Sequence, residues 1–317
     1  CPLYIEEVNF HHQHNEKGRV IMTTLNGIME LVTTDGELLS IEELRTQIIA
    51  EHEATKTSQR DAILAKRERE LRREKDKRTF YKVARKIVST NDTLKSADLG
   101  VVFRLMQHLY YGNDGLLSND SGRNGENPAT VANMMKSLGK SRRGLVNVLD
   151  RLEHAGIIKV DRSRKTAKYY INEELIACGK GVNMEKDFVK VYKTHTSKVL
   201  NRLTDTEAGI IFKLMPYIHV STYMLVENPD EMDLSKVKHL PVARLAEIVG
   251  LEYKSFTNKL RGIVRKGALA KISCGITALK GDAYALNPRI VDRGYISEVT
   301  DALTGIFDTL EERVSSK

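Results

Sequence analysis

The sequence predicts an α+β fold, mainly helical with small β-hairpins, and three observations carry this prediction. Residues 19–39 alternate apolar and polar side chains around two turn dipeptides. Residues 41–86 contain neither Gly nor Pro, which favours a long helix. A pattern of helices followed by two strands then occurs twice. We therefore expect five parts: a β-rich segment at 1–40, a long basic helix or linker at 41–86, two copies of one domain at 87–182 and 183–294, and an amphipathic helix at 295–317.

Composition is typical of a soluble globular protein and favours a polyanionic partner. Of the 317 residues, 41% are hydrophobic and 29% charged, and the formal net charge is +8. No apolar stretch approaches the roughly 18 residues of a membrane span, and the N-terminus lacks a secretory pattern. Cys1, Cys178 and Cys274 form no CxxC pair, so neither a disulfide framework nor a zinc site is expected. We expect a cytoplasmic protein without a membrane partner.

The first 86 residues are expected to form a β-meander and then a basic helix. Asn26-Gly27 and Asp35-Gly36 favour tight hairpin turns because both dipeptides tolerate positive φ. From Lys56 to Lys86 there are thirteen Lys and Arg residues against five Asp and Glu. Three interpretations stay open: a solvated helix with Glu–Arg pairs, a helix that follows DNA phosphates, and a coiled coil that forms a dimer.

An internal repeat sets the architecture of the remaining chain. "FRLM" at 103–106 and "FKLM" at 212–215 lie 109 residues apart, and their surroundings also match. Further matches lie in the same order on both sides of these motifs. The offset between the two copies rises to 111 and then to 115 towards the end of the repeat. The further matches are "LLSND" (116–120) with "LVENP" (225–229), "TVANMMKSLG" (130–139) with "PVARLAEIVG" (241–250), "GLVNVLDRLEHAG" (144–156) with "SFTNKLRGIVRKG" (255–267), "YYINEELIACG" (169–179) with "YALNPRIVDRG" (284–294), and the lead-in "FYKVARK" (80–86) with "FVKVYKT" (188–194).

The first copy contains three helices and two strands. Apolar side chains recur at helical spacing on three faces, ending in Met106, Leu138 and Leu152. Gly139 breaks the second helix, and Ser141 is a suitable N-cap for the third. The strands "IIKVDR" and "KYYIN" follow, joined by a basic loop. This order is a helix-turn-helix with an appended β-hairpin, which predicts a winged helix.

The second copy keeps this plan. Leu245 and Val249 are core positions of its second helix, and Phe256, Leu260 and Ile263 of its third. Gly250 and Gly267 end these two helices, and Pro241 is expected at the first helical position. The fold class is therefore two tandem winged-helix domains, preceded by the meander and the basic helix.

The second copy resembles a family of winged-helix proteins from plasmids and phages of Gram-positive bacteria, the RepL-type replication initiators and MarR-like transcription regulators. The residues that carry the likeness are "FVKVYK" (188–193), "GIIFKLMPYIH" (209–219), "VARLAEIVG" (242–250) and "YALNPRIVDRG" (284–294). Such proteins usually carry one winged helix, so the tandem departs from the pattern. The resemblance implies binding to duplex DNA and leaves open whether the role is transcription control or replication initiation.

In a helix-turn-helix the start of the third helix enters the major groove, so its outward side chains are the candidates for base contacts. Arg pairs with guanine and Asn with adenine, and a basic hairpin tip suits phosphates or the minor groove. The alternative is a solvated basic surface. In the first copy the candidates are Lys140, Ser141, Arg142, Arg143, Asn147 and Arg151 on the helix, with Arg162, Arg164, Lys165 and Lys168 on the hairpin.

The second copy is expected to be less basic. Glu252 lies at the start of its third helix, and its hairpin has only Lys271 and Lys280. Two interpretations stay open: this copy reads a different DNA sequence, or it serves dimerisation or the binding of a protein partner. We expect it to contact DNA. Its candidates are Tyr253, Lys254, Ser255, Asn258, Lys259 and Arg261.

No catalytic or cofactor motif is found. The chain has neither a P-loop nor a nucleophile elbow, and "HHQH" at 11–14 has no second cluster of ligands nearby in sequence. We expect a non-enzymatic, sequence-specific duplex-DNA-binding protein without cofactor or metal, located on nucleoid or plasmid DNA. A transcription regulator of phage or plasmid type is the first interpretation, and an initiator that binds origin repeats is the second. An architectural protein or RNA-polymerase-binding adaptor is the third.

Two partner surfaces complete the expectations. Residues 295–314 form an amphipathic pattern that either caps the second copy or pairs with a second subunit. A homodimer through the N-terminal or C-terminal helix, and contacts to host RNA polymerase or replication proteins, stay open as partners.

Overall fold

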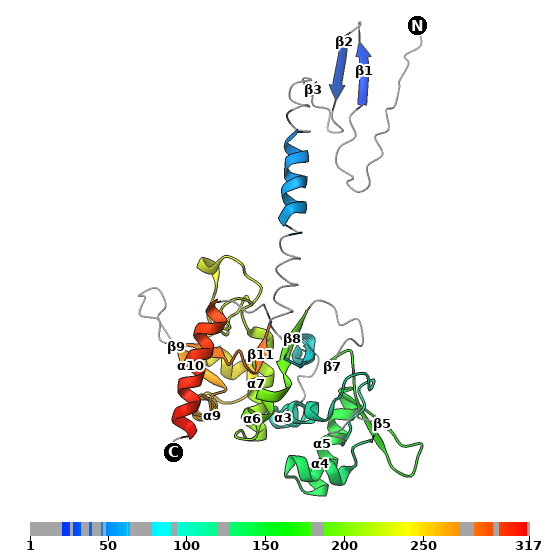
Figure 1. Cartoon of the computed structure of the whole chain (residues 1–317), viewed down its shortest axis with the longest axis vertical. Helices are drawn as coiled ribbons and strands as arrows, with labels where there is room; N and C mark the ends of the chain where they lie inside the picture. Colours follow the sequence, from blue (N-terminus) through cyan, green and yellow to red (C-terminus); the bar gives the residue numbers. More distant parts are fainter. Residues whose placement is uncertain are drawn as a thin grey trace. The chain divides into compact units, whose positions relative to one another are not determined.

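The computed structural model describes residues 21–25, 28–32, 38–39, 46, 49–61, 63, 78–89, 94–119, 127–178, 187–272, 282–293 and 298–315. The chain divides into two compact units, Cys1–Lys75 and Asp76–Lys317 (Figure 1). Helices and small antiparallel sheets make up both units, so the α+β class is confirmed. The metal-ligand alternative "HHQH", at 11–14, lies outside the described residues.

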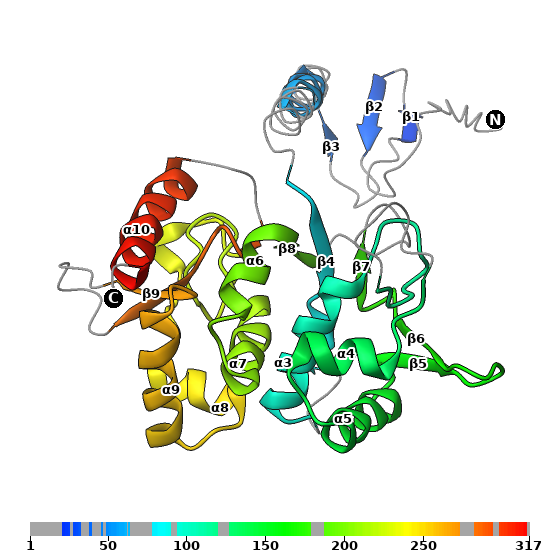
Figure 2. The ribbon, with the colours of Figure 1, turned by 60° about the horizontal axis from the view of Figure 1, so that its bottom comes forward.

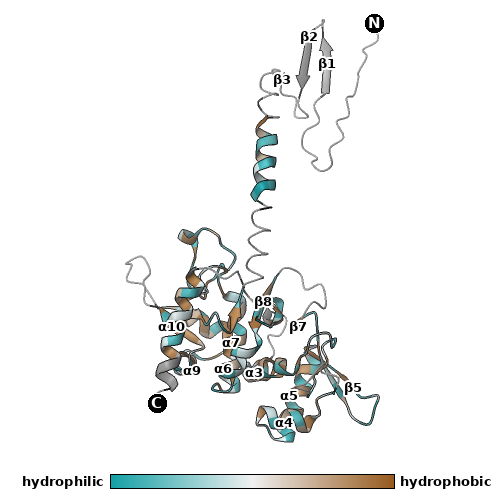
Figure 3. Cartoon of the chain, viewed as in Figure 1, coloured by the Kyte–Doolittle hydropathy of each residue, from teal (hydrophilic) through white to brown (hydrophobic). Residues whose placement is uncertain are grey.

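The N-terminal unit contains the expected meander. Strands β1 (Ile21–Leu25), β2 (Ile28–Val32) and β3 (Leu38–Leu39) form an antiparallel sheet in that order. Residues 49–61 are helical, and their side chains are exposed. This helix is mostly hydrophilic (Figure 3), as a solvated helix would be.

The helix expected over 41–86 does not reach its predicted end. Residues 80–84 form strand β4 (Phe80–Ala84), which pairs with strands from both repeats of the second unit. The prediction was wrong here because "FYKVA" alternates over only five residues within a basic stretch. Pairing partners about a hundred residues away decide its conformation.

The second unit contains two segments with the same order of α-helices and strands, the first repeat (78–178) and the second repeat (187–293). After β4, the first repeat has α2 (Lys86–Ser89), α3 (Ser96–Leu105), η1 (Met106–His108), α4 (Val131–Leu138), α5 (Arg142–His154), β5 (Ile158–Asp161), β6 (Lys168–Ile171) and β7 (Ile176–Cys178). The second has β8 (Phe188–Tyr192), α6 (Lys193–Leu200), α7 (Asp205–Leu214), η2 (Met215–Tyr217), η3 (Leu234–Lys236), α8 (Val242–Val249), α9 (Tyr253–Arg265), β9 (Leu269–Ile272), β10 (Ala283–Leu286) and β11 (Val291–Asp292).

The turns between the second and third helices match in the two repeats. Gly139 and Gly250 end α4 and α8 in the left-handed conformation, with φ of 63° and 74°. Glycine suits this position because a Cβ would be strained there. Ser141 caps α5, as predicted from the sequence. Pro241 lies one residue earlier than expected, at the N-cap of α8 rather than inside the helix.

A third segment pairs with each of the two hairpins, β5–β6 and β9–β10. It comes from the loop that follows α3 in the first repeat and α7 in the second. The Leu117 N–H donates to the Tyr169 carbonyl at 2.9 Å, and the Leu225 N–H donates to the Tyr284 carbonyl at 2.8 Å. Leu117 is therefore the structural counterpart of Leu225. The sequence alignment placed Leu116 there, one residue off, because the preceding turn is one residue longer in the first repeat.

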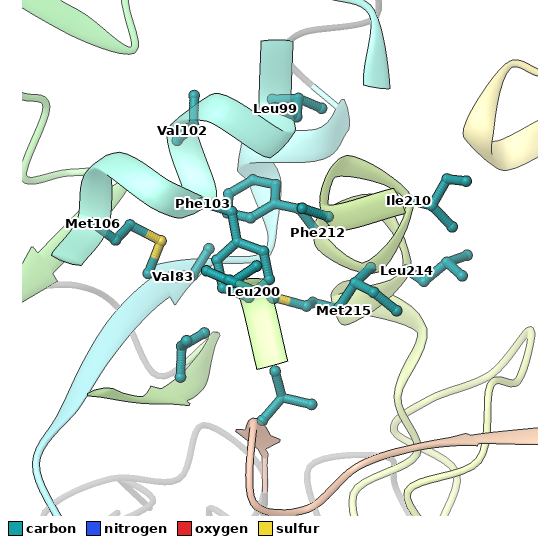
Figure 4. Close-up of a cluster of buried hydrophobic side chains, with 14 of the residues drawn as sticks. Val83, Leu99, Val102, Phe103, Met106, Leu200, Ile210, Phe212, Leu214 and Met215 are labelled. Carbon is teal, nitrogen blue, oxygen red and sulfur yellow. The ribbon is translucent and has the colours of Figure 1, made fainter. Parts of the chain in front are cut away.

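A single core joins the two repeats. The strand order β11-β8-β4-β7 places the two lead-in strands side by side in one sheet. Helices α3 and α7 pack against each other, with the Phe103 and Phe212 ring centroids 5.6 Å apart (Figure 4). An ideal Cβ on Gly100 would overlap the Asp205 carbonyl oxygen, and one on Gly209 would overlap that of Ser96. Glycine at both positions therefore permits the close approach of the helices.

Helix α10 (Glu298–Ser315) packs on the second repeat. Leu303 and Phe307 are buried, and the Arg289 guanidinium forms an ion pair with Asp308 at 2.5 Å. Of the two arrangements left open by the sequence, the structure shows the capping one, while Val299 and Ile306 stay exposed. Among the described residues, no helix combines the length and apolar character needed to cross a membrane.

Candidate nucleic-acid interface

The start of α5 presents two arginines to solvent. Leu145, Leu149 and Leu152 fix the helix orientation because their side chains are buried in the core. Arg142 and Arg143 are both exposed in the first turn, and Arg143 lies on the side opposite these leucines. Within the described part of the chain, neither guanidinium has a hydrogen bond or ion pair. Their donors are therefore available to an external acceptor.

Two further residues complete this end of α5. The Ser141 Oγ accepts a hydrogen bond from the Gly144 N–H at 3.2 Å, so Ser141 acts as a helix cap. Asn147 is exposed one turn after Arg143, and its amide offers both a donor and an acceptor. The start of α5 thus exposes Arg142, and the outward face of its first two turns carries Arg143 and Asn147.

Three other predicted site residues are engaged in ion pairs within the second unit. The Arg151 guanidinium donates to both carboxylate oxygens of buried Asp98, at 2.6 and 3.1 Å. Arg162 on the hairpin does the same with Glu153 of α5, at 2.7 and 2.6 Å, which lowers the pKa of Glu153. Lys140 is ion-paired with Asp205 of the second repeat. These side chains orient α5 and the hairpin.

The tip of the first hairpin carries the remaining cations. Arg164 and Lys165 are exposed in the turn between β5 and β6, and Lys168 is half-buried at its base. The Ser163 N–H donates to the Asp161 Oδ1 at 2.9 Å, which shapes the turn and lowers the pKa of Asp161. The exposed tip thus carries a dense positive charge.

The second repeat presents a different set of side chains at the equivalent helix start. Tyr253 is 56% exposed, Lys254, Asn258 and Arg261 are also exposed, and Ser255 and Lys259 are half-buried. Glu252 is the N-cap of α9, and its carboxylate accepts the Lys254 and Ser255 N–H groups, each at 3.1 Å. The acidic residue therefore stabilises the helix start.

The expectation of a less basic second copy needs correction for the helix itself. Helix α5 carries Arg142, Arg143 and Arg151 against Asp150 and Glu153. Helix α9 carries Lys254, Lys259, Arg261 and Arg265 and no carboxylate. On its hairpin, Lys271 is paired with Asp282 at 2.8 Å, and Lys280 lies outside the described residues.

Four residues that sequence reasoning did not single out hold the third helices in place. Asp98 at the start of α3 binds Arg151 of α5, and the equivalent Glu207 of α7 binds Lys266 after α9 at 2.6 Å. Burial alone would raise the pKa of Glu207, but the hydrogen bonds from Lys266 and Thr204 outweigh it and lower the pKa. Asp205 binds Lys140, and the Ser96 hydroxyl donates to the Val249 carbonyl at 3.1 Å. The only signal in the sequence was the polar residues that open two otherwise apolar segments, "SADLGVV" and "DTEAGII".

Helices α5 and α9, the third helix of each repeat, lie along one side of the second unit. Figure 2 shows α5 and α9 along the lower side, with the β5–β6 hairpin at one end and β9 at the other. In the part of the chain that the structure describes, no group of three His, Cys, Asp or Glu side chains is placed to hold a metal ion.

Comparisons of the chain with protein-family models, with curated proteins and with solved structures found no match. Chemically, the surface offers guanidinium, ammonium and amide donors from two helix ends and one hairpin tip, which together suit a polyanion with hydrogen-bonding edges.

Proposed function

We propose that the two repeats are winged helices and that the chain binds double-stranded DNA in a sequence-specific manner, without catalysis of its own. The proposal is supported most by one observation: α5 and α9, whose first turns carry exposed hydrogen-bonding side chains, lie along the same side of one compact unit (Figure 2). In a helix-turn-helix the third helix enters the major groove, where the pattern of donors and acceptors distinguishes all four base pairs.

The exposed face of α5 provides side chains suited to base edges. Arg142 and Arg143 have the geometry for bidentate pairing with guanine, and Asn147 for pairing with adenine. Helix α9 offers Asn258 at the equivalent position, with Tyr253 and Lys254 in place of the arginines. The two helices thus present different side chains, so we expect them to read different bases.

The hairpin tip is assigned to the DNA backbone. Arg164 and Lys165 are exposed on a short loop, where contacts to phosphates require charge more than exact geometry. Arg162, in contrast, is held by Glu153 and contributes mainly to the position of the hairpin. We therefore expect the tip to strengthen binding without selecting a sequence.

Regulation of transcription from one specific site is the role we propose, in a phage or plasmid setting. Two modules on one chain bind with avidity, because the second module acts at high effective concentration once the first is bound. This arrangement reads a long site without a second protein copy. The resemblance of the second repeat to plasmid initiators keeps origin binding as the second candidate, which several copies of the site within an origin would identify.

Selection of binding sites from a random duplex pool tests the proposal. At about 150 mM salt, binding through phosphate attraction alone is weak, so selected sequences report on base contacts. We expect a long consensus with two parts. A consensus with one part would assign the second repeat to a protein partner such as RNA polymerase, and no consensus would replace site-specific regulation with an architectural role.

A further inference from the structure

We infer that the DNA target consists of two unequal half-sites in inverted orientation, read by a single chain. This inference depends on the proposed DNA-binding function and adds the symmetry of its substrate. It is carried by a two-fold relation between the repeats, which is visible in three independent sets of contacts.

The first set is the pairing of the lead-in strands. Strands β4 and β8 are equivalent in the two repeats and pair antiparallel, with Lys82 opposite Lys190 at the centre. Phe80 lies opposite Tyr192, and Ala84 lies opposite Phe188. Exchange of the repeats converts the first of these pairs into the second. A two-fold axis through the central pair has this property, whereas a simple translation would leave equivalent strands parallel.

The second set is the contact between helices α3 and α7. Gly100 faces the carbonyl oxygen of Asp205, and Gly209 faces that of Ser96. Gly100 and Gly209 are equivalent, and so are Ser96 and Asp205. Exchange of the repeats therefore maps one contact onto the other. The axis that passes through the sheet also passes between these helices.

The third set connects the axis to the DNA-reading helices. Asp98 of α3 holds Arg151 of α5, and Glu207 of α7 holds Lys266 at the end of α9. The turn before each third helix is also tied to the opposite repeat, through Lys140 with Asp205 and through Val249 with Ser96. Both third helices thus keep a fixed relation to the same axis.

This symmetry determines the orientation of the half-sites. B-DNA has local two-fold axes perpendicular to its length, and rotation about such an axis exchanges the strands. Two reading helices related by a two-fold axis therefore read inverted sequences, as in dimeric helix-turn-helix proteins with half-sites about one helical turn apart. A direct repeat would require helices related by translation.

Sequence differences make the two half-sites unequal. Arg142, Arg143 and Asp150 of α5 correspond to Tyr253, Lys254 and Arg261 of α9. Asn147 corresponds to Asn258, the same residue type. We therefore expect the half-sites to share the base pair contacted by the asparagine and to differ at the positions contacted by the other three pairs.

The test makes α9 equivalent to α5 at the three differing positions. The variant Tyr253→Arg/Lys254→Arg/Arg261→Asp changes only exposed side chains. The first half-site is the part of the wild-type consensus retained in a selection with Tyr253→Ala/Lys254→Ala. We expect the triple variant to bind an inverted repeat of this half-site at least tenfold more tightly than the wild type does. The two proteins should have the same affinity for a direct repeat of equal spacing.

Two outcomes separate the inference from the function on which it depends. Tighter binding to the direct repeat would overturn the inverted arrangement and leave sequence-specific binding intact. Absence of any consensus with the wild type would instead overturn the proposed function. The Tyr253→Ala/Lys254→Ala variant is the matched control and should gain on neither duplex. The reciprocal variant Arg142→Tyr/Arg143→Lys/Asp150→Arg should prefer an inverted repeat of the second half-site, which keeps the test decisive if the first triple variant folds poorly.

Discussion

Asp205, in the first turn of α7, is ion-paired with Lys140, the residue directly before the N-cap of α5. The same carboxylate accepts a hydrogen bond from the Arg104 Nε at 2.9 Å. One side chain of the second repeat therefore holds both the first helix and the turn of the first repeat. Because the pair joins the two repeats, it bears on how accurately α5 and α9 are spaced.

Asp205→Asn should weaken binding to a complete two-part site more than binding to a single half-site. Loss of the charge loosens the turn before α5, so the two helices no longer match the DNA spacing together. We expect a three- to tenfold loss on the complete site and a loss of about 1–2 kcal/mol in the free energy of unfolding. Titrations with both duplexes and urea denaturation measure these effects. Equal losses on the two duplexes would contradict a spacing role.

Arg142→Ala/Arg143→Ala should remove the preference for the selected site and leave weak, salt-sensitive binding. At roughly 1.4 kcal/mol for each arginine–guanine pair, the specific affinity should fall by about 100-fold. Fluorescence anisotropy with the selected duplex and with a scrambled duplex measures the preference. Lys236→Ala/Lys238→Ala removes the same charge from an exposed loop and serves as the control. A similar loss in that control would show that net charge alone accounts for the effect.

Arg164→Ala/Lys165→Ala should weaken binding to all sequences to the same extent. If each side chain neutralises one phosphate, the slope of log K against log salt should become shallower by about 2. Measurements of affinity between about 50 and 200 mM salt provide the slope. An effect confined to the selected sequence would mean that the hairpin reads bases instead.

Gly209→Ala should destabilise the whole second unit, because the new methyl group would overlap the Ser96 carbonyl oxygen. Overpacking against backbone leaves the helices no room to relax, and we expect a loss of about 3 kcal/mol in the free energy of unfolding. Gly305→Ala is the matched control in α10, where a Cβ meets no atom within 4 Å. That substitution should be neutral or stabilise by up to about 1 kcal/mol. A small effect at Gly209 would argue against the close packing of α3 and α7.

Glu207→Gln should reduce stability at neutral pH, and the difference from the wild type should disappear in acid. The pKa of Glu207 is lowered in the folded protein by Lys266 and Thr204. Its stabilising contribution is therefore complete above the unfolded-state pKa of about 4.3 and is lost as the pH falls through the lower folded-state pKa. We expect a difference of about 2 kcal/mol at pH 7. Denaturation curves of both proteins from pH 7 to pH 3 test this; a constant difference would exclude the carboxylate as its source.

The sequence predicted the local features well. The turn at Gly139 and the cap at Ser141 depend on neighbouring residues only, so helical periodicity and cap chemistry were sufficient. The doubling of the module was visible because buried positions such as Phe103 and Phe212 repeat at a regular offset. These features include the helix ends that form the candidate interface.

Features that depend on distant contacts were missed. The sequence predicts a helix or helical linker where β4 lies, because the partners of this strand, β7 and β8, are far away in sequence. Arg151 and Lys140 are candidates for DNA contact by sequence, yet the structure pairs them with carboxylates 53 and 65 residues away. No periodicity encodes such pairs. The sheet shared by the two repeats could not be predicted for the same reason.

The two ion pairs that hold the third helices show that the repeats use different side chains for the same structural role. An Asp–Arg pair in the first repeat and a Glu–Lys pair in the second connect equivalent helices with different chemistry. In a homodimer, a mutation of the shared gene alters both subunits at once, so any change must suit both ends of the target. In a fused chain, each half accumulates substitutions separately. Under the proposed function, a single base change in one half-site can therefore be matched by substitutions in one repeat alone, while the other repeat keeps its contacts.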